Sequence, residues 1–202
     1  MGHGKFSGEP EAVWLTQEGT PDRRMRILQD FSFTDPASKI WPAPAGSLVD
    51  GASIPRALWT VVGSPYTGDY RRASIVHDVA CDEAVGNKKK RRAADRMFFH
   101  ACRAGGCSIW EATVLYLGVR VGTAAGDVPS WHAAMSIQLA GPRTRRTEDE
   151  LRLEQDFKQI TDRVLAQGET DDPHELERRT DAAFEVVLGL KPVRGTNKRG
   201  VA

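Results

Sequence analysis

The chain has 202 residues, of which 40% are hydrophobic and 27% charged, and its formal net charge at pH 7 is +1. A chain of this length can bury a sizeable core, and we expect one domain with an appendage. The small net charge gives no electrostatic argument for a nucleic-acid or membrane partner. The chain contains no run of about 18 apolar residues, so no transmembrane segment is predicted. No signal-peptide pattern follows the first methionine. The three cysteines cannot all pair, which argues against a disulfide framework and favours a reducing compartment.

The first third of the chain is predicted to be extended. Residues 1–11 are expected to be a flexible start, because they are rich in glycine. Short strands are predicted at 12–16, at 24–33, at 39–41 and at 47–49. The strand at 24–33 rests on an alternation that places Met25, Ile27, Phe31 and Phe33 on one face. A proline-rich turn at 42–46 separates the last two segments, so we expect a small antiparallel sheet or a set of hairpins.

A loop reading Asp-Gly-Ala-Ser-Ile-Pro-Arg follows, from Asp50 to Arg56. Gly51 permits a tight backbone, and the proline stiffens the exit. The side chains of Asp50 and Ser53 can bond to nearby backbone N–H groups and hold the loop in one shape. Two interpretations are open: a structural turn, or a site loop. In the site loop Asp50 presents its carboxylate to a metal, and Ser53 and Arg56 face a substrate; a solvent-facing arginine is the alternative for Arg56.

Two helices are predicted within residues 69–104, on either side of a Gly-Asn turn. On the first, alanine and valine side chains form an apolar arc that contains His77, and Asp78 lies on its polar flank. On the second, Asp95 lies at the edge of the apolar face. Small side chains let two helices approach closely, so the imidazole and the two carboxylates are expected to converge. The sequence therefore predicts the candidate site here, with His77 in contact with Asp95.

A third core helix is predicted from Ser108, because Glu111 three residues later completes a capping box. It is apolar around most of its surface and is therefore expected to be buried. One apolar stripe consists of Trp110, Val114, Leu117 and Val121. Tyr116 and Arg120 share a face of this helix. Two interpretations are open for this pair: packing with surface pairing, or a role at the site.

The composition changes after the core domain, which we place at residues 12–125. Residues 126–147 are expected to be a linker with a short helix. A second capping box, Thr147 with Glu150, opens a helix, and an Asp-Pro pair at 172–173 opens another.

The two C-terminal helices are predicted to form an acidic, amphipathic hairpin over residues 148–190. From Glu148 to Glu185 there are 13 acidic and 5 basic residues. We expect the hairpin to pack on the core, on a partner protein or on a second copy of the chain. Residues 191–202 carry four basic and no acidic residues, and a disordered tail is predicted. The fold class is α+β: N-terminal strands, a three-helix core and a C-terminal helical hairpin.

Several motifs, in this order, resemble domain-of-unknown-function family 1353, which is found mostly in tailed phages and prophages. The motifs are Asp50-Gly-Ala-Ser-Ile-Pro-Arg, Leu58-Trp59, Ile75-Val76-His77-Asp78, Ala94-Asp95 with Phe98, and Tyr116 with Arg120-Val121-Gly122. The resemblance spans residues 24–124. It implies a phage origin and a place in the host cytoplasm or the phage particle, but no settled activity.

The two-helix stretch is also similar to the catalytic dyad of the secretory phospholipase A-two family. That likeness implies that His77 is a general base for water, that Asp95 orients its imidazole, and that Asp78 binds calcium together with the loop at Asp50. A carboxylate on one ring nitrogen fixes the tautomer, and calcium prefers oxygen ligands. The chain departs from that family in three ways: it has no disulfides, no glycine-dense calcium loop, and Cys81 where the family has tyrosine.

Two functions are compatible with these observations. The first is a small hydrolase, with Ca²⁺ as a candidate cofactor, that acts on an ester or amide of the host envelope with His77 as general base. The second is a non-catalytic phage virion or assembly protein, in which the His-Asp-Asp cluster is a buried network that fixes two helices. Cys81 shares a face with His77 and is expected to be inert packing rather than a nucleophile. An open cleft around the cluster would favour the first function, and a sealed cluster would favour the second.

Overall fold

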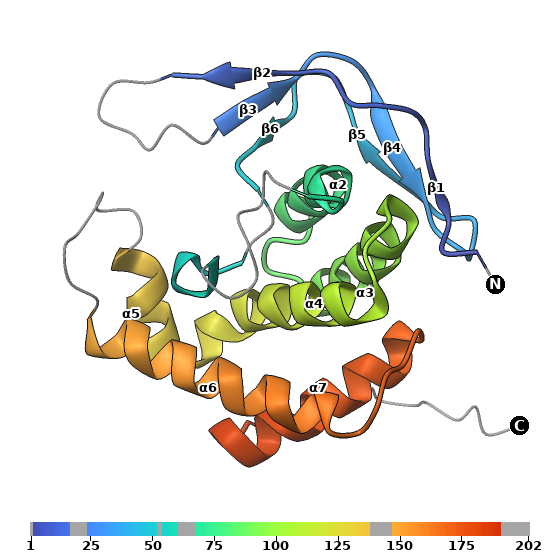
Figure 1. Cartoon of the computed structure of the whole chain (residues 1–202). Helices are drawn as coiled ribbons and strands as arrows, with labels where there is room; N and C mark the ends of the chain where they lie inside the picture. The colour runs from blue at the N-terminus through green and yellow to red at the C-terminus, as the bar shows by residue number, and fades with distance from the viewer. Residues whose placement is uncertain (1, 17–23, 52–53, 60–67, 138–146, 191–202) are drawn as a thin grey trace, which may run out of the picture.

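The computed structural model describes residues 2–16, 24–51, 54–59, 68–137 and 147–190. The fold is α+β, as the sequence predicted, with antiparallel strands followed by helices. In Figure 1 the strands form a layer at the top, α2 and α3 lie beneath them, and α6 and α7 cover α4 from the opposite side. The two-helix stretch therefore occupies the middle of the molecule.

The strands form two three-stranded antiparallel sheets, in the orders β1-β4-β5 and β2-β3-β6. Their bounds are Lys5–Phe6 (β1), Ala12–Leu15 (β2), Arg24–Ile27 (β3), Phe31–Thr34 (β4), Ile40–Ala43 (β5) and Leu48–Val49 (β6). The single strand predicted at 24–33 is therefore two strands that belong to different sheets. The chain changes sheet between them, where Leu28 is half exposed and the Asp30 carboxylate accepts the Ala45 N–H at 2.9 Å. Each half keeps the alternation, but the polar Gln29 interrupts the apolar face between them, and this interruption coincides with the point where the chain changes sheet.

Two further expectations about the N-terminal third need correction. The start of the chain was expected to be flexible, but β1 pairs with β4 in the register Lys5 to Thr34. The proline-rich turn was expected to begin at Pro42, but β5 continues through Pro42, which pairs with Ser32. β5 is the outer strand of its sheet, and an edge strand tolerates a residue that donates no backbone hydrogen bond.

Three of the helices begin at capping residues that the sequence predicted, and one of them also ends at the predicted glycine. Their bounds are Arg56–Leu58 (η1), Arg71–Asp82 (α2), Lys88–Gly105 (α3), Ile109–Ala124 (α4), Ala125–Asp127 (η2), Pro129–Ile137 (α5), Glu148–Leu165 (α6) and Pro173–Leu188 (α7). Both predicted capping boxes are formed, at Ser108 before α4 and at Thr147 before α6. α7 begins after Asp172 and ends at Gly189.

α4 is the central helix of the core, and its buried residues include Val114, Leu117 and Val121. Trp110 was assigned to the same apolar stripe, but 52% of it is exposed. It lies in the first turn of α4. Ile54 packs against Gly118 of α4, where an added Cβ would lie 3.2 Å from the isoleucine side chain.

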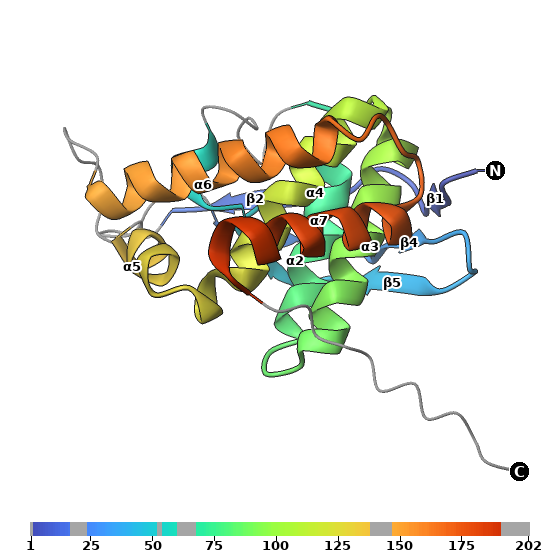
Figure 2. The ribbon, with the colours of Figure 1, turned by 90° about the horizontal axis from the view of Figure 1, so that it is seen from below.

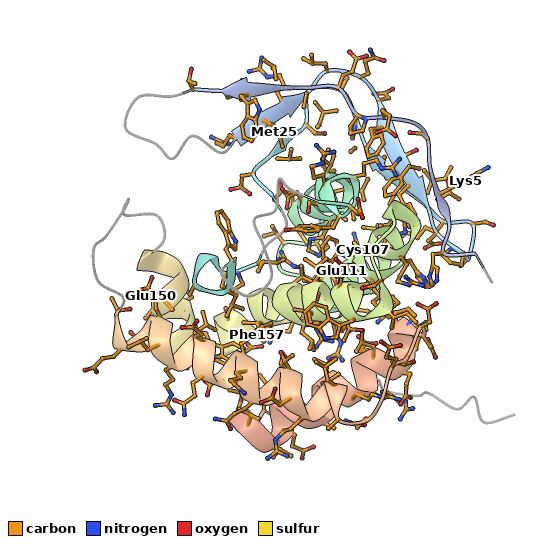
Figure 3. All side chains as sticks on the ribbon, viewed as in Figure 1. Lys5, Met25, Cys107, Glu111, Glu150 and Phe157 are labelled. Atoms are coloured by element: carbon orange, nitrogen blue, oxygen red, sulfur yellow. The ribbon has the colours of Figure 1, made fainter. Side chains whose placement is uncertain are left out.

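The C-terminal hairpin packs on its own core, as one of the open alternatives predicted. Figure 2 shows α6 and α7 side by side across α4 and α3, and Figure 3 places Phe157 between α6 and α4. The inward apolar side chains are almost fully buried; they are Leu153, Phe157, Ile160, Val164, Leu176 and Phe184. The hairpin is also held by ion pairs, for example from Arg92 and Arg96 of α3 to Glu177 of α7 at 2.8 and 2.7 Å. The basic tail predicted at 191–202 lies outside the described residues.

Among the helices that the structure describes, none combines the length and the apolar character that crossing a membrane requires.

Candidate functional site

α2 and α3 pack closely because their facing surfaces are made of small side chains. The buried residues on these surfaces include Ala73, Val76, Ala80, Ala94 and Ala101. The turn between the helices is set by Gly86, with φ of 74°, and by Asn87, whose side chain accepts the Lys90 N–H at 3.0 Å. With so little side-chain volume between the helices, any polar group on the same faces must find its partner on the other helix.

His77 and Asp95 are those polar groups, and they meet as the sequence predicted. His77 Nε2 lies 3.0 Å from Asp95 Oδ1, and both residues are 0% exposed. Burial lowers the pKa of His77, and the hydrogen bond to Asp95 offsets this only in part, so the imidazole is neutral at neutral pH. A carboxylate only accepts, so Nε2 carries the proton and donates it, and Nδ1 is left as the acceptor.

Cys81 lies one helical turn from His77, and its thiol packs against the imidazole ring. Its Sγ is 3.6 Å from Nδ1 and 3.4 Å from Nε2 of His77, and the Phe98 ring centroid is 4.8 Å from that of the imidazole. Burial raises the pKa of the Cys81 thiol, so the group stays protonated and is a poor nucleophile. Both ring nitrogens of His77 therefore face protein atoms in the interior.

Asp95 has two further partners, both on α4. Thr123 Oγ1 donates to Oδ2 at 2.8 Å, and Arg120 Nε lies 3.6 Å from the same oxygen. Arg120, itself 4% exposed, donates to Tyr116 Oη and to Asp181 Oδ1 of α7, each at 3.0 Å. The cluster thus joins four helices, α2, α3, α4 and α7.

Sequence reasoning missed Thr123 and Asp181 and left the role of Arg120 open. A positively charged residue in the middle of an otherwise apolar helix was the available signal, because a buried arginine needs carboxylate partners. Arg91 of α3 also reaches this region, where its Nε donates to Thr123 Oγ1 at 3.2 Å.

Asp78 faces the other way, toward the strands. Its Oδ2 accepts the backbone N–H groups of Asp50 at 3.0 Å and Gly51 at 2.7 Å, and the residue is 7% exposed. Burial raises the pKa of Asp78 well above its usual range, and the nearby charge of Asp50 adds to this, although the two backbone hydrogen bonds act in the opposite direction. Gly51 has φ of 98°, a conformation that L side chains rarely adopt, which lets two successive N–H groups point at one oxygen.

A cavity of about 410 Å³ lies beside Asp78, between α2 and the sheet β2-β3-β6. Its wall on the sheet side includes Trp14, Met25 and Val49, and Figure 3 shows Met25 in the space between β3 and α2. The α2 side contributes Asp78 with Ser74 and other side chains. His77 and Asp95 do not line this cavity. The structure therefore divides the predicted cluster into a sealed pair and one carboxyl group at an opening.

The Asp50–Arg56 loop is only partly described. Asp50 is exposed and contacts Asp78 through its backbone N–H, Ser53 lies outside the described residues, and the side chain of Arg56 is also outside them. The described part of the loop meets Asp78 through N–H groups, whereas calcium binds oxygen atoms, so calcium binding by Asp78 and Asp50 stays a prediction. Within the described ranges, the side chains that come together as metal donors are those of His77, Cys81 and Asp95.

Comparison with known proteins agrees with the motifs that the sequence contains. Residues 25–119 match the model of a family described as a protein of unknown function, DUF1353. This segment holds His77, Asp78 and Asp95. Thr123 and the C-terminal hairpin lie outside it.

Two relatives come from Sinorhizobium fredii (strain NBRC 101917 / NGR234). The "Uncharacterized protein y4jT" is 38% identical over 118 residues, which are 57% of this chain and 33% of the relative. The "Uncharacterized protein y4iH" is 34% identical over 99 residues, which are 48% of this chain and 40% of the relative. The chain thus matches only a third to two fifths of the length of these curated relatives. No solved structure shows a significant match.

Proposed function

We propose that this protein is a non-catalytic structural or assembly protein of a phage or prophage, in which His77 and Asp95 hold α2 against α3. The observation that carries the proposal is the sealed environment of the pair: both residues are 0% exposed, and the ring nitrogens face Asp95 and Cys81. A general base must reach the proton it removes directly or through one water molecule. The phage setting is supported by the resemblance of the motifs described above.

A stabilising role follows from the chemistry of the pair. A buried carboxylate without partners costs several kcal/mol, whereas Asp95 has the imidazole, the Thr123 hydroxyl and the Arg120 guanidinium around it. These contacts fix the positions of α2, α3 and α4 relative to one another. Such a network supports a defined shape, which an assembly component needs.

The surface that we assign to a partner is the outer face of the C-terminal hairpin. The apolar sides of α6 and α7 are used within the chain, so they are not available to a second protein. The outer face carries exposed carboxylates, among them Asp162, Glu169 and Glu185. A phage structural protein with a basic surface, or a basic segment of a second copy, is the complementary partner.

Two measurements test the structural role. Phage particles and assembly intermediates from an induced host are purified and searched for the protein by mass spectrometry; its absence from both contradicts the proposal. In parallel, His77→Ala is compared with the wild-type chain by thermal unfolding. The variant is expected to lower the melting temperature while assembly below that temperature continues.

A second candidate, hydrolysis of an ester or amide of the host envelope, is favoured by one observation: Asp78 lies on a cavity wall next in sequence to His77. In this candidate His77 is the general base oriented by Asp95, Asp78 and Asp50 serve a calcium ion, and Ser53 and Arg56 face the substrate. For this chemistry Nδ1 of His77 would have to reach a water molecule, in the place now taken by Cys81.

The hydrolase candidate has its own test. The protein is incubated with phospholipid vesicles and with peptidoglycan, with and without a chelator, and the products are analysed. Activity that is lost in both His77→Ala and Asp78→Asn would establish the candidate, provided that both variants unfold cooperatively. Activity that persists in folded His77→Ala would exclude His77 as the base.

A further inference from the structure

The sealed cluster contains a set of donors that the structural role alone does not require. An imidazole, a thiol and a carboxylate lie together between α2 and α3, and the three are all buried. His77 and Cys81 are four residues apart on α2 and so share a face, and Asp95 comes from the antiparallel helix. A hydrogen bond between His77 and Asp95 would suffice to join the helices, so the placement of a thiol against the same ring calls for an explanation of its own.

The distances between these donors are close to those around a tetrahedral metal ion. One ligand atom from each residue lies within 4.8 Å of the others. His77 Nε2 is 3.0 Å from Asp95 Oδ1 and 3.4 Å from Cys81 Sγ. Zinc bonds of about 2.0–2.3 Å at tetrahedral angles separate ligand atoms by about 3.3–3.6 Å. Small shifts of the side chains would therefore bring all three onto one ion.

Neighbouring residues hold the carboxylate in the orientation that such a site needs. Thr123 Oγ1 donates to Asp95 Oδ2 at 2.8 Å, and Arg120 Nε lies 3.6 Å from that same oxygen. Oδ1 is left to face His77 and Cys81. Hydrogen bonds of this kind to the non-coordinating oxygen are typical of metal sites, where they fix the ligand and tune its basicity. Arg120 Nε has no hydrogen-bond partner among the described atoms, so it is free to tighten on Oδ2.

We propose that His77, Cys81 and Asp95 form a buried site for a transition-metal ion of intermediate softness, and that the physiological ion is Zn²⁺. The donor set selects this class, because a thiolate favours zinc over calcium or magnesium, which require oxygen donors. The three protein ligands leave the fourth tetrahedral position to a water molecule. This inference goes beyond the structural role proposed above, which does not depend on a metal.

The protons balance simply. Nε2 of His77 must give its proton to Nδ1, a change of tautomer that releases nothing, and Asp95 binds as the carboxylate. Cys81 must lose its thiol proton, which passes to solvent when the sulfur–metal bond forms. Binding of one ion therefore releases one proton, and affinity should rise with pH.

Cobalt(II) is the probe that tests the site, because its bond to a thiolate gives a charge-transfer absorption band that nitrogen and oxygen ligands do not give. The full chain is stripped with a chelator and titrated with cobalt(II), then with zinc(II). We expect one equivalent of cobalt to bind with the thiolate band, zinc to remove the band by displacement, and the melting temperature to rise with zinc. Cys81→Ala should lose the band. Cys107→Ala, which removes a buried thiol outside the cluster, should keep it.

The outcomes separate clearly. Absence of the band in the wild-type chain, or its survival in Cys81→Ala, overturns the metal site and leaves the proposed structural role untouched. If Cys81→Ala fails to fold, Asp95→Asn serves in its place and is expected to bind cobalt at least tenfold more weakly. Equal cobalt affinity in folded Asp95→Asn also overturns the proposal.

Discussion

Asp95→Asn is the most informative single change, because asparagine has nearly the same volume and removes only the charge and one acceptor. Asp95 is 0% exposed and accepts from His77 at 3.0 Å and Thr123 at 2.8 Å. Whichever way the amide is turned, its NH₂ group faces a donor, either the His77 N–H or the Arg120 Nε. Arg120 also loses a nearby carboxylate while remaining buried.

The magnitude follows from these contacts. Hydrogen bonds to charged groups contribute about 1.5–3 kcal/mol and neutral ones about 0.5–1.5 kcal/mol, so two weakened bonds cost roughly 2–3 kcal/mol. Arg120 adds to this by losing one of its carboxylate neighbours, although its bond to Asp181 remains. We expect a total loss of about 3 kcal/mol, which for a chain of this size corresponds to a fall of about 6–12 °C in melting temperature.

Urea unfolding followed by far-UV circular dichroism measures the effect, in chelator so that metal does not contribute. Asp162→Asn is the matched control, because the Asp162 side chain is 64% exposed and pairs with the exposed Lys158 across one helical turn. The control is expected to change the free energy of unfolding by less than about 0.5 kcal/mol. A loss in Asp95→Asn no larger than in the control would refute the claim that the buried cluster stabilises the helix pair.

The remaining predictions concern pH, the cavity carboxyl group and one close backbone contact. Burial lowers the pKa of both His77 and His100, so the unfolded chain binds more protons than the folded one. The free energy of unfolding should therefore fall as the pH drops below about 6.5, by up to about 1.4 kcal/mol per unit for each histidine; equal stability at pH 7.5 and 5.5 would contradict this. Burial raises the pKa of Asp78, so the stability linked to its protonation is complete at low pH and is lost as the pH rises through the folded-state pKa. Asp78→Asn should consequently stabilise the protein at pH 8, with a gain that shrinks toward pH 4, and a destabilised variant at pH 8 would argue for a stabilising carboxylate. In Gly105→Ala the new Cβ would lie 2.3 Å from a backbone oxygen of the turn before α2, whereas at Gly126 it would meet nothing within 4 Å. Thermal unfolding should show a loss of about 2 kcal/mol or more for the first and a change within about 0.5 kcal/mol for the second, and similar melting temperatures for the two would show that the turn yields.

The elements that local chemistry determines were predictable from the sequence. The capping boxes at Ser108 and Thr147 locate the starts of two helices, and the 3.6-residue repeat places His77 and Asp95 on facing surfaces. Those signals lie within a few residues of one another along the chain. The contact between His77 and Asp95 followed from them, because two helices joined by a short turn must be antiparallel neighbours.

The rest depended on contacts between distant segments. Gln29 interrupts the apolar face between Ile27 and Phe31, but one polar residue does not show that the two segments enter different sheets. The partner of Arg120 on α7 lies 61 residues away, and the direction in which Asp78 points depends on where the backbone of Gly51 passes. The exposure of single residues was equally unpredictable: a helical wheel assigns Trp110 to the apolar stripe, but it does not show which part of the stripe other elements cover.

The ion pair between Arg120 and Asp181 shows that the buried cluster extends beyond the segment that matches the family model. Similarity to the family ends at residue 119, yet the next residue is a buried arginine whose carboxylate partner lies in the last helix. A fragment cut at the limit of similarity would end before Arg120 and would also lose Thr123, so Asp95 would keep only His77 of the partners described above. The segment that matches the family model therefore omits part of the buried cluster, and a fragment meant to keep the whole cluster should extend through α7.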